Sequence, residues 1–303
     1  MRMNPMQDRR TYGDGRRRSG GIRWWVILLF GGYVLWQWFG NAKTDPYTGE
    51  RAHYGATAEE EAQLGLQAFQ EVLATERALP PNDPAARQVG EIARRLVERA
   101  DEVEAILATK HGQPSPELAQ RFDWSVAVLQ SDQANAFCLP GGKMAVYTGL
   151  FPVAQNEDAL AVVMGHEIAH ALLRHGSQRM AQQKLVQMGQ MAAGIALGDM
   201  DPRQQQMIMG ALGAGAQYGF ILPYGREHET QADEVGLMLA AAACYDPQAA
   251  VPLWERMAQL NGGQRPPEFA STHPDPANRI ERLRALLPEA EKFRAKYCGA
   301  GAR

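Results

Sequence analysis

The sequence ALAVVMGHEIAHALLRH, residues 159–175, constrains the fold of this 303-residue chain more than any other stretch. Its apolar residues predict a buried helix, on which His166 and His170 project from one face about one turn apart. Two neutral imidazoles at this spacing can share one Zn²⁺, with the Glu167 carboxylate beside the metal as a general base. Burying these side chains without partners would be costly. The stretch therefore predicts a zinc site, and the alternative is a set of core residues satisfied by hydrogen bonds.

A catalytic zinc site usually has three protein ligands and one open position. The residues that directly follow the HExxH motif do not supply the third ligand. Leu173 and Gly176 stand where the pattern HExxHxxGxxH has glycine and histidine. His175 is out of that register, which favours a supporting or surface role. The third ligand must therefore come from another segment.

The segment YGREHETQADEVG, residues 224–236, leads several acidic groups into an apolar helix. On a helix, Glu229 and Asp233 fall on one stripe with small residues that allow close approach to another helix. Glu227 faces nearly the opposite side, and His228 lies a quarter-turn away. We therefore predict Glu229 as the third metal ligand. Asp233 is placed to accept the second N–H of a ligand histidine, and the alternative is a carboxylate on the helix surface.

The N-terminal region combines arginines with the apolar run IRWWVILLFGGYVLWQWF, residues 22–39, which has no charge after Arg23. Such a run approaches the length needed to cross a hydrocarbon core of ~30 Å, and its tryptophans resemble the aromatic belts of a bilayer span. We expect a cytoplasmic Arg-rich tail at residues 1–20 and a transmembrane anchor at residues 21–39, with the rest of the chain outside the cytoplasm. The alternative is a cleaved signal peptide, although no good cleavage site follows the run.

The remaining chain divides into a linker and one domain. Residues 40–56 contain proline and glycine and are typical of a juxtamembrane linker, and residues 57–298 form the expected catalytic domain. Residues 122–129 alternate like a strand, and residues 134–150 predict two short strands around a Pro-Gly-Gly turn. The chain is mainly helical before these strands and from Glu157 onward. We therefore predict a mainly α fold with a small β-sheet, an α+β domain.

Two later stretches rich in Gly, Ala and Met, residues 185–198 and 207–223, resemble membrane spans at first sight. The first is too short to cross a bilayer, and the second is interrupted by Gln217 and several glycines. We therefore expect buried or lid-like helices.

Charge and cysteine content set further limits. The formal net charge is −3, and the body of the chain has no basic aromatic stretch, so no nucleic-acid partner is expected. Cys138, Cys244 and Cys298 show no metal-binding spacing. A disulfide between Cys244 and Cys298 and a set of buried free thiols remain equally open.

Together, these motifs resemble a known family. HEIAH followed by Arg226-x-x-Glu229-x-x-Ala232-Asp233 is similar to the gluzincin metallopeptidases that include the CAAX prenyl protease, HtpX, the BepA-type periplasmic proteases and the mitochondrial OMA proteases. The segments NAFCLPGGKMAVYTGL, LPYGREHETQAD, YDPQAAVPLWERM and STHPDPANRIERL extend the resemblance over residues 57–290. Gly225 departs from the family's usual serine, which affects a turn or cap more than the ligands. The chain most resembles compact, singly anchored members.

The resemblance implies a zincin-like domain with one Zn²⁺ per subunit, held by His166, His170 and Glu229, with Glu167 as the base. It also implies that an edge strand borders the cleft and pairs with an extended substrate, formed by Asn135, Ala136, Phe137, Cys138 and Leu139. His273 and Arg279 would lie near the metal and stabilise the oxyanion of the reaction. His273 has an alternative role as a fourth ligand that keeps the enzyme latent.

The sequence thus predicts a zinc endopeptidase in the bacterial inner membrane, held by its single N-terminal helix and facing the periplasm. The resemblance and the anchor together suggest unfolded or misassembled envelope proteins as substrates, and the oligomeric state stays open. One alternative is a zinc-stabilised holdase or scaffold that binds unfolded chains without cutting them. Another is a peptidase restricted to oligopeptides.

Overall fold

The computed structural model describes residues 22–40, 42–198, 200–217, 221–261, 273 and 278–299. The predicted cytoplasmic tail, residues 1–20, lies outside this part of the chain. The helices are α1 (Trp24–Gly40), α2 (Ala58–Thr75), α3 (Pro84–Lys110), α4 (Leu118–Arg121), α5 (Phe151–Ala154), α6 (Glu157–Leu172), α7 (His175–Ala196), α8 (Pro202–Ala216), α9 (Leu222–Ala242), α10 (Ala250–Asn261) and α12 (Arg279–Cys298), with short 3₁₀ turns at η1 (Thr148–Leu150) and η3 (Pro247–Ala249). The strands are β1 (Lys43–Thr44), β2 (Arg51–Ala52), β3 (Ser125–Leu129), β4 (Ala136–Leu139) and β5 (Lys143–Tyr147). The predicted α+β fold is confirmed.

The larger sheet has the strand order β3-β5-β4, so β4 lies at an edge. The central strand β5 is parallel to β3, with Val126 opposite Met144, and antiparallel to β4, with Phe137 opposite Ala145. All five residues of β5 are buried, as expected for a strand covered on both faces. Gly141 and Gly142 connect β4 to β5 with φ of +82° and +83°, a conformation that favours glycine. The predicted strands and turn are therefore confirmed.

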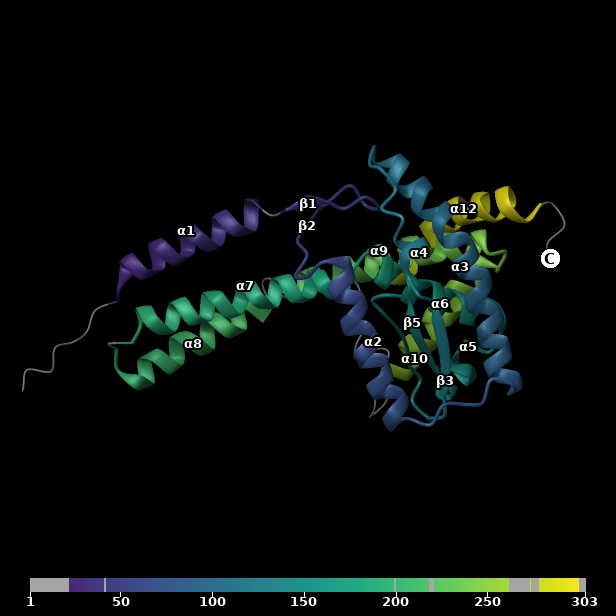
Figure 1. Ribbon diagram of the computed structural model, residues 1–303, viewed down its shortest axis with the longest axis horizontal. Helices are drawn as coiled ribbons and strands as arrows, with labels where there is room; N and C mark the ends of the chain where they lie inside the picture. Colours follow the sequence, from purple (N-terminus) through teal and green to yellow (C-terminus); the bar gives the residue numbers. More distant parts are fainter. Residues whose placement is uncertain are drawn as a thin grey trace, which may run out of the picture.

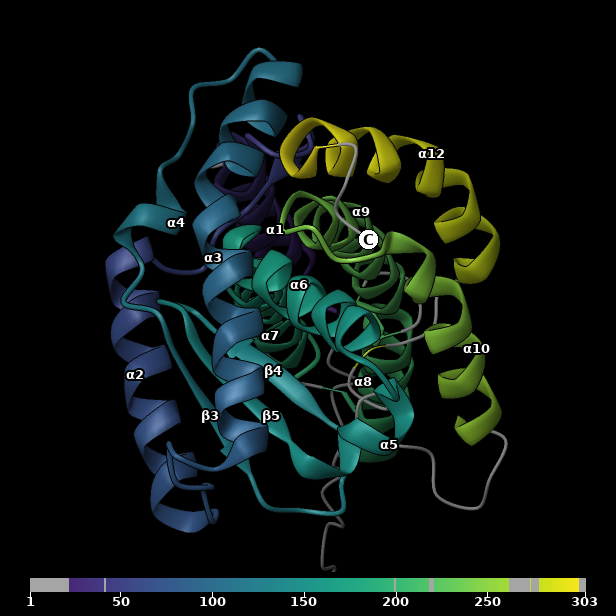
Figure 2. The same ribbon diagram turned by 90° about the vertical axis from the view of Figure 1, so that its right-hand side faces the viewer.

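Helices α3 and α6 pack against this sheet (Figure 2), and α6 lies beside its edge strand β4. Helix α2 is capped at Thr57, whose side chain accepts from the backbone N–H of Glu60, while the Glu60 side chain accepts from the backbone N–H of Thr57. This reciprocal capping satisfies two backbone donors at the start of the helix. The largest buried cluster joins residues of α3, α6, α9 and the sheet.

Helices α6 and α9 meet at glycines. A Cβ atom on Gly236 would lie 2.6 Å from the backbone nitrogen of His166, and one on Gly165 would lie 2.7 Å from the carbonyl oxygen of Gly236. These distances leave no room for a side chain, so the two backbones touch directly. The small residues predicted to allow close approach of residues 224–236 do so against the helix that carries the HExxH motif. This contact positions Glu229 opposite His166.

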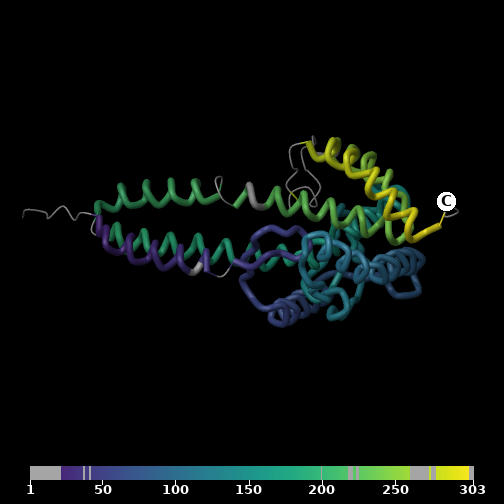
Figure 3. The backbone as a smooth tube through the Cα atoms, turned by 90° about the horizontal axis from the view of Figure 1, so that it is seen from above, coloured from purple at the N-terminus to yellow at the C-terminus, as the bar shows by residue number. Residues whose placement is uncertain are grey.

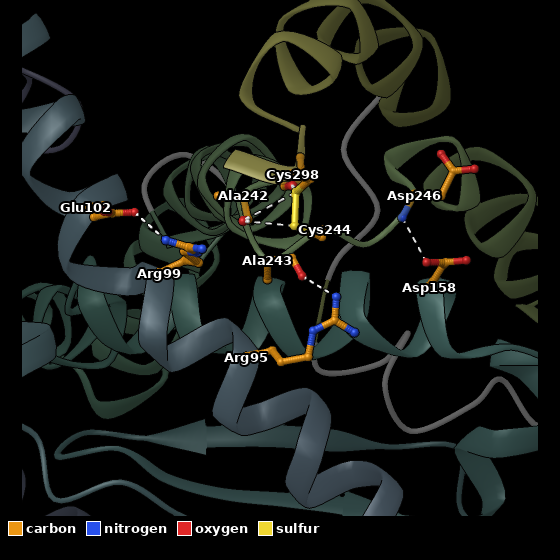
Figure 4. Close-up of a disulfide and its surroundings, with 10 residues drawn as sticks. Arg95, Arg99, Glu102, Asp158, Ala242, Ala243, Cys244, Asp246 and Cys298 are labelled. Carbon is orange, nitrogen blue, oxygen red and sulfur yellow. Dashed lines mark hydrogen bonds and ion pairs between the residues drawn. A yellow bond between two sulfur atoms is a disulfide. The ribbon is translucent and has the colours of Figure 1, made fainter. Parts of the chain in front are cut away.

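A disulfide joins the ends of α9 and α12. Cys244 and Cys298 are bonded, with their Cα atoms 5.6 Å apart, and Figure 4 shows the bond beside the carbonyl groups at the end of α9. Arg95 of α3 donates to the carbonyl oxygen of Ala243 at 2.6 Å, next to the bridge. Cys138 is a buried free thiol. The disulfide left open by the sequence is therefore present.

Residues 42–56, predicted as part of a linker, pack against the domain. Tyr47 is 3% exposed, and its hydroxyl donates to Glu104 of α3 at 2.6 Å. Gly55 donates from its backbone to the carbonyl oxygen of Ser177 at 3.0 Å. This segment therefore holds the N-terminal helix at a defined place relative to the domain.

Helices α1, α7 and α8 form an extension that projects from the domain (Figures 1 and 3). Helix α8 has no buried residue and packs on α7 at the periphery, so of the expected buried or lid-like helix, the buried form is not found there. Exposed apolar side chains cover α1, including Trp24, Trp25, Leu28, Leu29, Trp36 and Phe39.

The transmembrane anchor predicted at residues 21–39 needs correction. Within the described ranges, no helix combines the length and the apolar character needed to cross a membrane.

Candidate metal centre

Four side chains converge where α6 meets α9. His166 and His170 turn their Nε2 atoms toward each other at 3.0 Å. Glu229 places Oε2 3.3 Å from Nε2 of His166 and Oε1 3.4 Å from Nε2 of His170. His273 places Nδ1 3.1 Å from both carboxylate oxygens of Glu229. One potential ligand atom from each of the four residues lies within 4.8 Å of all the others.

This geometry fits a zinc ion. Ligand atoms at ~2.0–2.1 Å from a tetrahedral zinc are about 3.3 Å apart, close to the 3.0–3.4 Å found among His166, His170 and Glu229. Two imidazole nitrogens and a carboxylate oxygen are also a ligand set that zinc favours. The structure thus brings together the three predicted ligands, with His273 beside them.

The pKa values of the cluster are strongly shifted. Burial alone would raise the pKa of Glu229, but hydrogen bonds from His166 and His273 keep it well below its usual range. Burial lowers the pKa of His170 well below its usual range. Burial would also lower the pKa of His166, but Asp233 and Glu229 raise it to about 9. An ionised carboxylate and a neutral imidazole are the forms that bind metal, so Glu229 and His170 are ready to bind, whereas a metal would displace a proton from His166.

Glu167 lies between the cluster and the edge strand. It is 3% exposed, and its Oε1 atom is 3.5 Å from Nε2 of His273. Burial raises the pKa of Glu167, while the neighbouring His273 and His166 and the backbone N–H of Cys138, which donates to it from β4, act in the opposite direction. A carboxylate with a raised pKa is better matched to proton transfer near neutral pH. The predicted base and the predicted substrate strand are therefore in contact.

Asp233 and Arg279 lie behind the cluster. Oδ1 of Asp233 is 3.0 Å from Nδ1 of His166, the contact that the helix stripe predicts. Arg279 donates from Nη2 to the same oxygen at 2.6 Å, and its Nη1 lies 3.6 Å from Oε2 of Glu229. Its guanidinium also stacks 3.2 Å over the ring of Trp254. This geometry favours a role for Arg279 in holding the two carboxylates over the role at the oxyanion suggested by the family resemblance.

The structure shows the partners of His170. His175 places Nδ1 2.8 Å from Nδ1 of His170, which agrees with the supporting role, one of the two that the motif register favoured. Gln231, on α9, contacts the other nitrogen of His175 at 3.0 Å. The spacing of His175 from the motif was the only signal in the sequence, and nothing there pointed to Gln231. Glu227 is exposed and lies away from the cluster, as predicted.

Comparison with known proteins agrees with this geometry. The sequence pattern described as peptidase family M48 matches residues 95–287. This chain belongs to peptidase family M48. The M48 peptidase is 31% identical over 272 residues to the mitochondrial metalloendopeptidase OMA1 of Schizosaccharomyces pombe, covering 88% of this chain and 73% of the relative.

Two further relatives are longer than the aligned region. The human mitochondrial metalloendopeptidase OMA1 is 30% identical over 289 residues, which cover 89% of this chain and 51% of the human protein. The beta-barrel assembly-enhancing protease of Escherichia coli is 27% identical over 250 residues, which cover 80% of this chain and 47% of the relative. The M48 peptidase is thus a zinc metalloendopeptidase.

Proposed function

We propose that this M48 peptidase cleaves extended segments of unfolded or misassembled envelope proteins at a membrane surface. His166, His170 and Glu229 serve as zinc ligands, and Glu167 serves as the general base. The observation that carries the proposal is the contact between the base and the sheet edge: the N–H of Cys138 in β4 donates to Glu167, next to the ligand cluster. A peptide paired with this edge would lie across the reactive groups.

The residues around the metal site have different roles in the reaction. A bound Zn²⁺ supplies Lewis-acid polarisation of the scissile carbonyl and acidifies a water molecule. Glu167 accepts the proton of the attacking water and delivers it to the leaving amine. Asp233 accepts the Nδ1–H of His166 and so directs the Nε2 lone pair toward the metal. His273 lies close enough to Glu167 and Glu229 to contact either the metal or the substrate.

The edge strand selects substrates that can adopt an extended conformation, with little dependence on their sequence. An extended peptide adds to a sheet edge through its main-chain N–H and C=O groups, so side chains influence binding only through neighbouring pockets. Strand β4 offers Ala136–Leu139 for this pairing. The preferred substrates are therefore chains without stable structure, and the preference for particular residues is loose.

Cleavage of a matched pair of substrates tests this proposal. A reduced and alkylated protein is expected to be cut at several sites, whereas its native, disulfide-bonded form stays intact over the same time. A chelator should stop the cleavage and added zinc should restore it, because the ligand cluster holds the catalytic metal. Mass spectrometry of the products measures both effects. Equal cleavage of the native and alkylated forms would refute the role of the edge strand, and cleavage of short peptides alone would limit the enzyme to oligopeptides.

The extension formed by α1, α7 and α8 supports a membrane location. The exposed Trp and Leu residues of α1 match the interfacial and acyl regions of a bilayer, and arginines precede them in the sequence. The disulfide between Cys244 and Cys298 is typical of an oxidising compartment. We propose attachment to the bacterial inner membrane, with the domain in the periplasm.

Fractionation of the full chain tests the location. The wild type is expected in the membrane fraction, and replacing Trp24, Trp25 and Leu28 by serine should move it to the soluble fraction, because the apolar attachment is lost. A variant with serine at the exposed Leu64 and Leu66 of α2 is the control, since these residues lie outside the extension. Loss of membrane binding in the control, or its retention in the α1 variant, would contradict the proposed attachment.

A further inference from the structure

A series of polar contacts leads away from the metal cluster through His170. Nδ1 of His170 is 2.8 Å from Nδ1 of His175, and Nε2 of His175 is 3.0 Å from Oε1 of Gln231. Nε2 of Gln231 donates to the Glu50 carboxylate at 2.6 Å, and this outer contact is exposed. His175 itself is buried, with 3% of its surface exposed. The predicted ligand His170 is thereby connected to a carboxylate on the opposite side of α9.

The direction of each hydrogen bond in this series follows from the last contact, between Gln231 and Glu50. The Glu50 carboxylate accepts from the amide N–H₂ of Gln231, which leaves Oε1 of Gln231 as the acceptor toward His175. His175 therefore carries its proton on Nε2, and its Nδ1 presents a lone pair. His170 must then donate from Nδ1, and its Nε2 lone pair points toward Glu229 and His166.

We propose that His175 is a positioning residue that sets the tautomer of His170, with Gln231 and Glu50 fixing the tautomer of His175 in turn. The inference rests on the proposed function, in which His170 binds zinc through Nε2. Each ligand histidine then has its own partner at Nδ1: Asp233 for His166, and His175 for His170. An imidazole that protonated Nε2 instead would present a donor to the metal and could not bind it.

Packing holds the His175 ring in the orientation that its hydrogen bonds to His170 and Gln231 require. Its ring stacks on His228, with centroids 4.1 Å apart and planes 12° from parallel. Nε2 of His228 is in turn 3.1 Å from Oε1 of Gln178 on α7. His228, on α9 with Gln231, thus fixes the plane of the His175 ring. These contacts also define the competing explanation, in which His175 only fills space between α7 and α9.

The hydrogen-bond series ends at Glu50, in the segment of residues 42–56 that connects α1 to the rest of the domain. The orientation of the predicted zinc ligand His170 therefore depends on whether this segment is packed in place. Zinc affinity should respond to changes at Glu50, even though Glu50 does not belong to the metal cluster.

A matched pair of variants at position 175 in the full-length protein separates tautomer control from packing. His175→Asn places Oδ1 where Nδ1 was, so it still accepts from His170 and should bind zinc within a few-fold of the wild type. His175→Leu has similar bulk and no acceptor, and should lose about 10–100-fold in zinc affinity, the usual effect of removing a partner of a metal-bound histidine. Competition with a chelator measures the affinity, and thermal unfolding checks that both variants fold.

The outcomes are distinct. Equal zinc affinity of His175→Leu and the wild type overturns the inference, as does an equal loss in His175→Asn and His175→Leu, which would assign His175 to packing. If the wild type itself binds no zinc, the proposed function fails and not this inference alone. A second pair of variants tests the contact between His175 and Gln231. Gln231→Glu keeps an acceptor for His175 and should keep zinc binding, while Gln231→Met removes the acceptor and should weaken it.

A further measurement uses the wild-type protein alone, so it does not depend on how well a variant folds. The ¹⁵N chemical shifts of histidine rings report which nitrogen carries the proton. In zinc-free wild-type protein, His170 is expected to be protonated at Nδ1 and His175 at Nε2. Finding the His170 proton on Nε2 would overturn the inference even if every variant behaved as predicted.

Discussion

Replacing Glu167 with glutamine is expected to lower the rate of peptide hydrolysis by about 10²–10⁴-fold while zinc stays bound. The amide has nearly the shape of the carboxylate but cannot accept the proton of the attacking water. Glu167 contributes no atom to the ligand set His166, His170, Glu229 and His273, so the metal should be retained. Hydrolysis of an alkylated protein and metal analysis of the same preparation measure the two effects together.

A control for this variant comes from the surface of α9. Glu234, whose side chain is 41% exposed, undergoes the same chemical change in Glu234→Gln without approaching the metal cluster. It should keep the activity of the wild type. Hydrolysis by Glu167→Gln at a rate near that of the wild type would disprove the proposed mechanism. Loss of zinc together with activity would show that Glu167 supports the metal site instead of acting as the base.

Replacing Glu229 with alanine should remove zinc binding. The change deletes the carboxylate that contacts both His166 and His170, and leaves Arg279 with one of its two carboxylate partners. Removing an outer partner of a ligand costs about 10–100-fold in metal affinity, so the loss of the ligand itself should exceed about 100-fold. Chelator competition and metal analysis of the purified protein measure this loss. Activity should fall in parallel.

Glu227→Ala is the matched control, because it deletes the same group two residues earlier on the same helix. Glu227 lies on the other side of α9, where it contacts Glu50 and not the metal cluster, and its removal leaves the Glu50 carboxylate in place for Gln231, so zinc content and activity should stay within a few-fold of the wild type. If Glu227→Ala lost zinc and Glu229→Ala kept it, the helix-face argument would be wrong. A loss in both variants would indicate that α9 as a whole had shifted.

Local patterns explain what could be predicted from the sequence. The spacing of His166 and His170 and the stripe shared by Glu229 and Asp233 are properties of single helices, so the structure places these residues as helical geometry requires. The strands of the larger sheet depend on neighbouring residues in the same way. The variants above measure the roles of Glu167 and Glu229 at the metal site.

The features that could not be predicted depend on contacts between distant segments. His175 and Gln231 meet across 56 positions, and Gln231 and Glu50 across 181, and no periodicity encodes either pairing. The apolar run of residues 22–39 carried a composition signal for a membrane span, but no helix in the described ranges has the length and apolar character of one. Composition likewise suggested a buried or lid-like helix at α8, and whether a helix is buried depends on what surrounds it and not on the helix alone.

The shortness of β4 has a consequence for substrate selection. Its four residues can pair with an extended segment of about 13 Å, at ~3.3 Å per residue. A folded protein must open locally to release such a segment. When opening and closing are faster than cleavage, the rate of proteolysis follows the population of the open form. A target destabilised locally by about 1.4 kcal/mol would then be cut about tenfold faster. With β4 in its proposed role, the enzyme would rank its targets by the free energy of local unfolding.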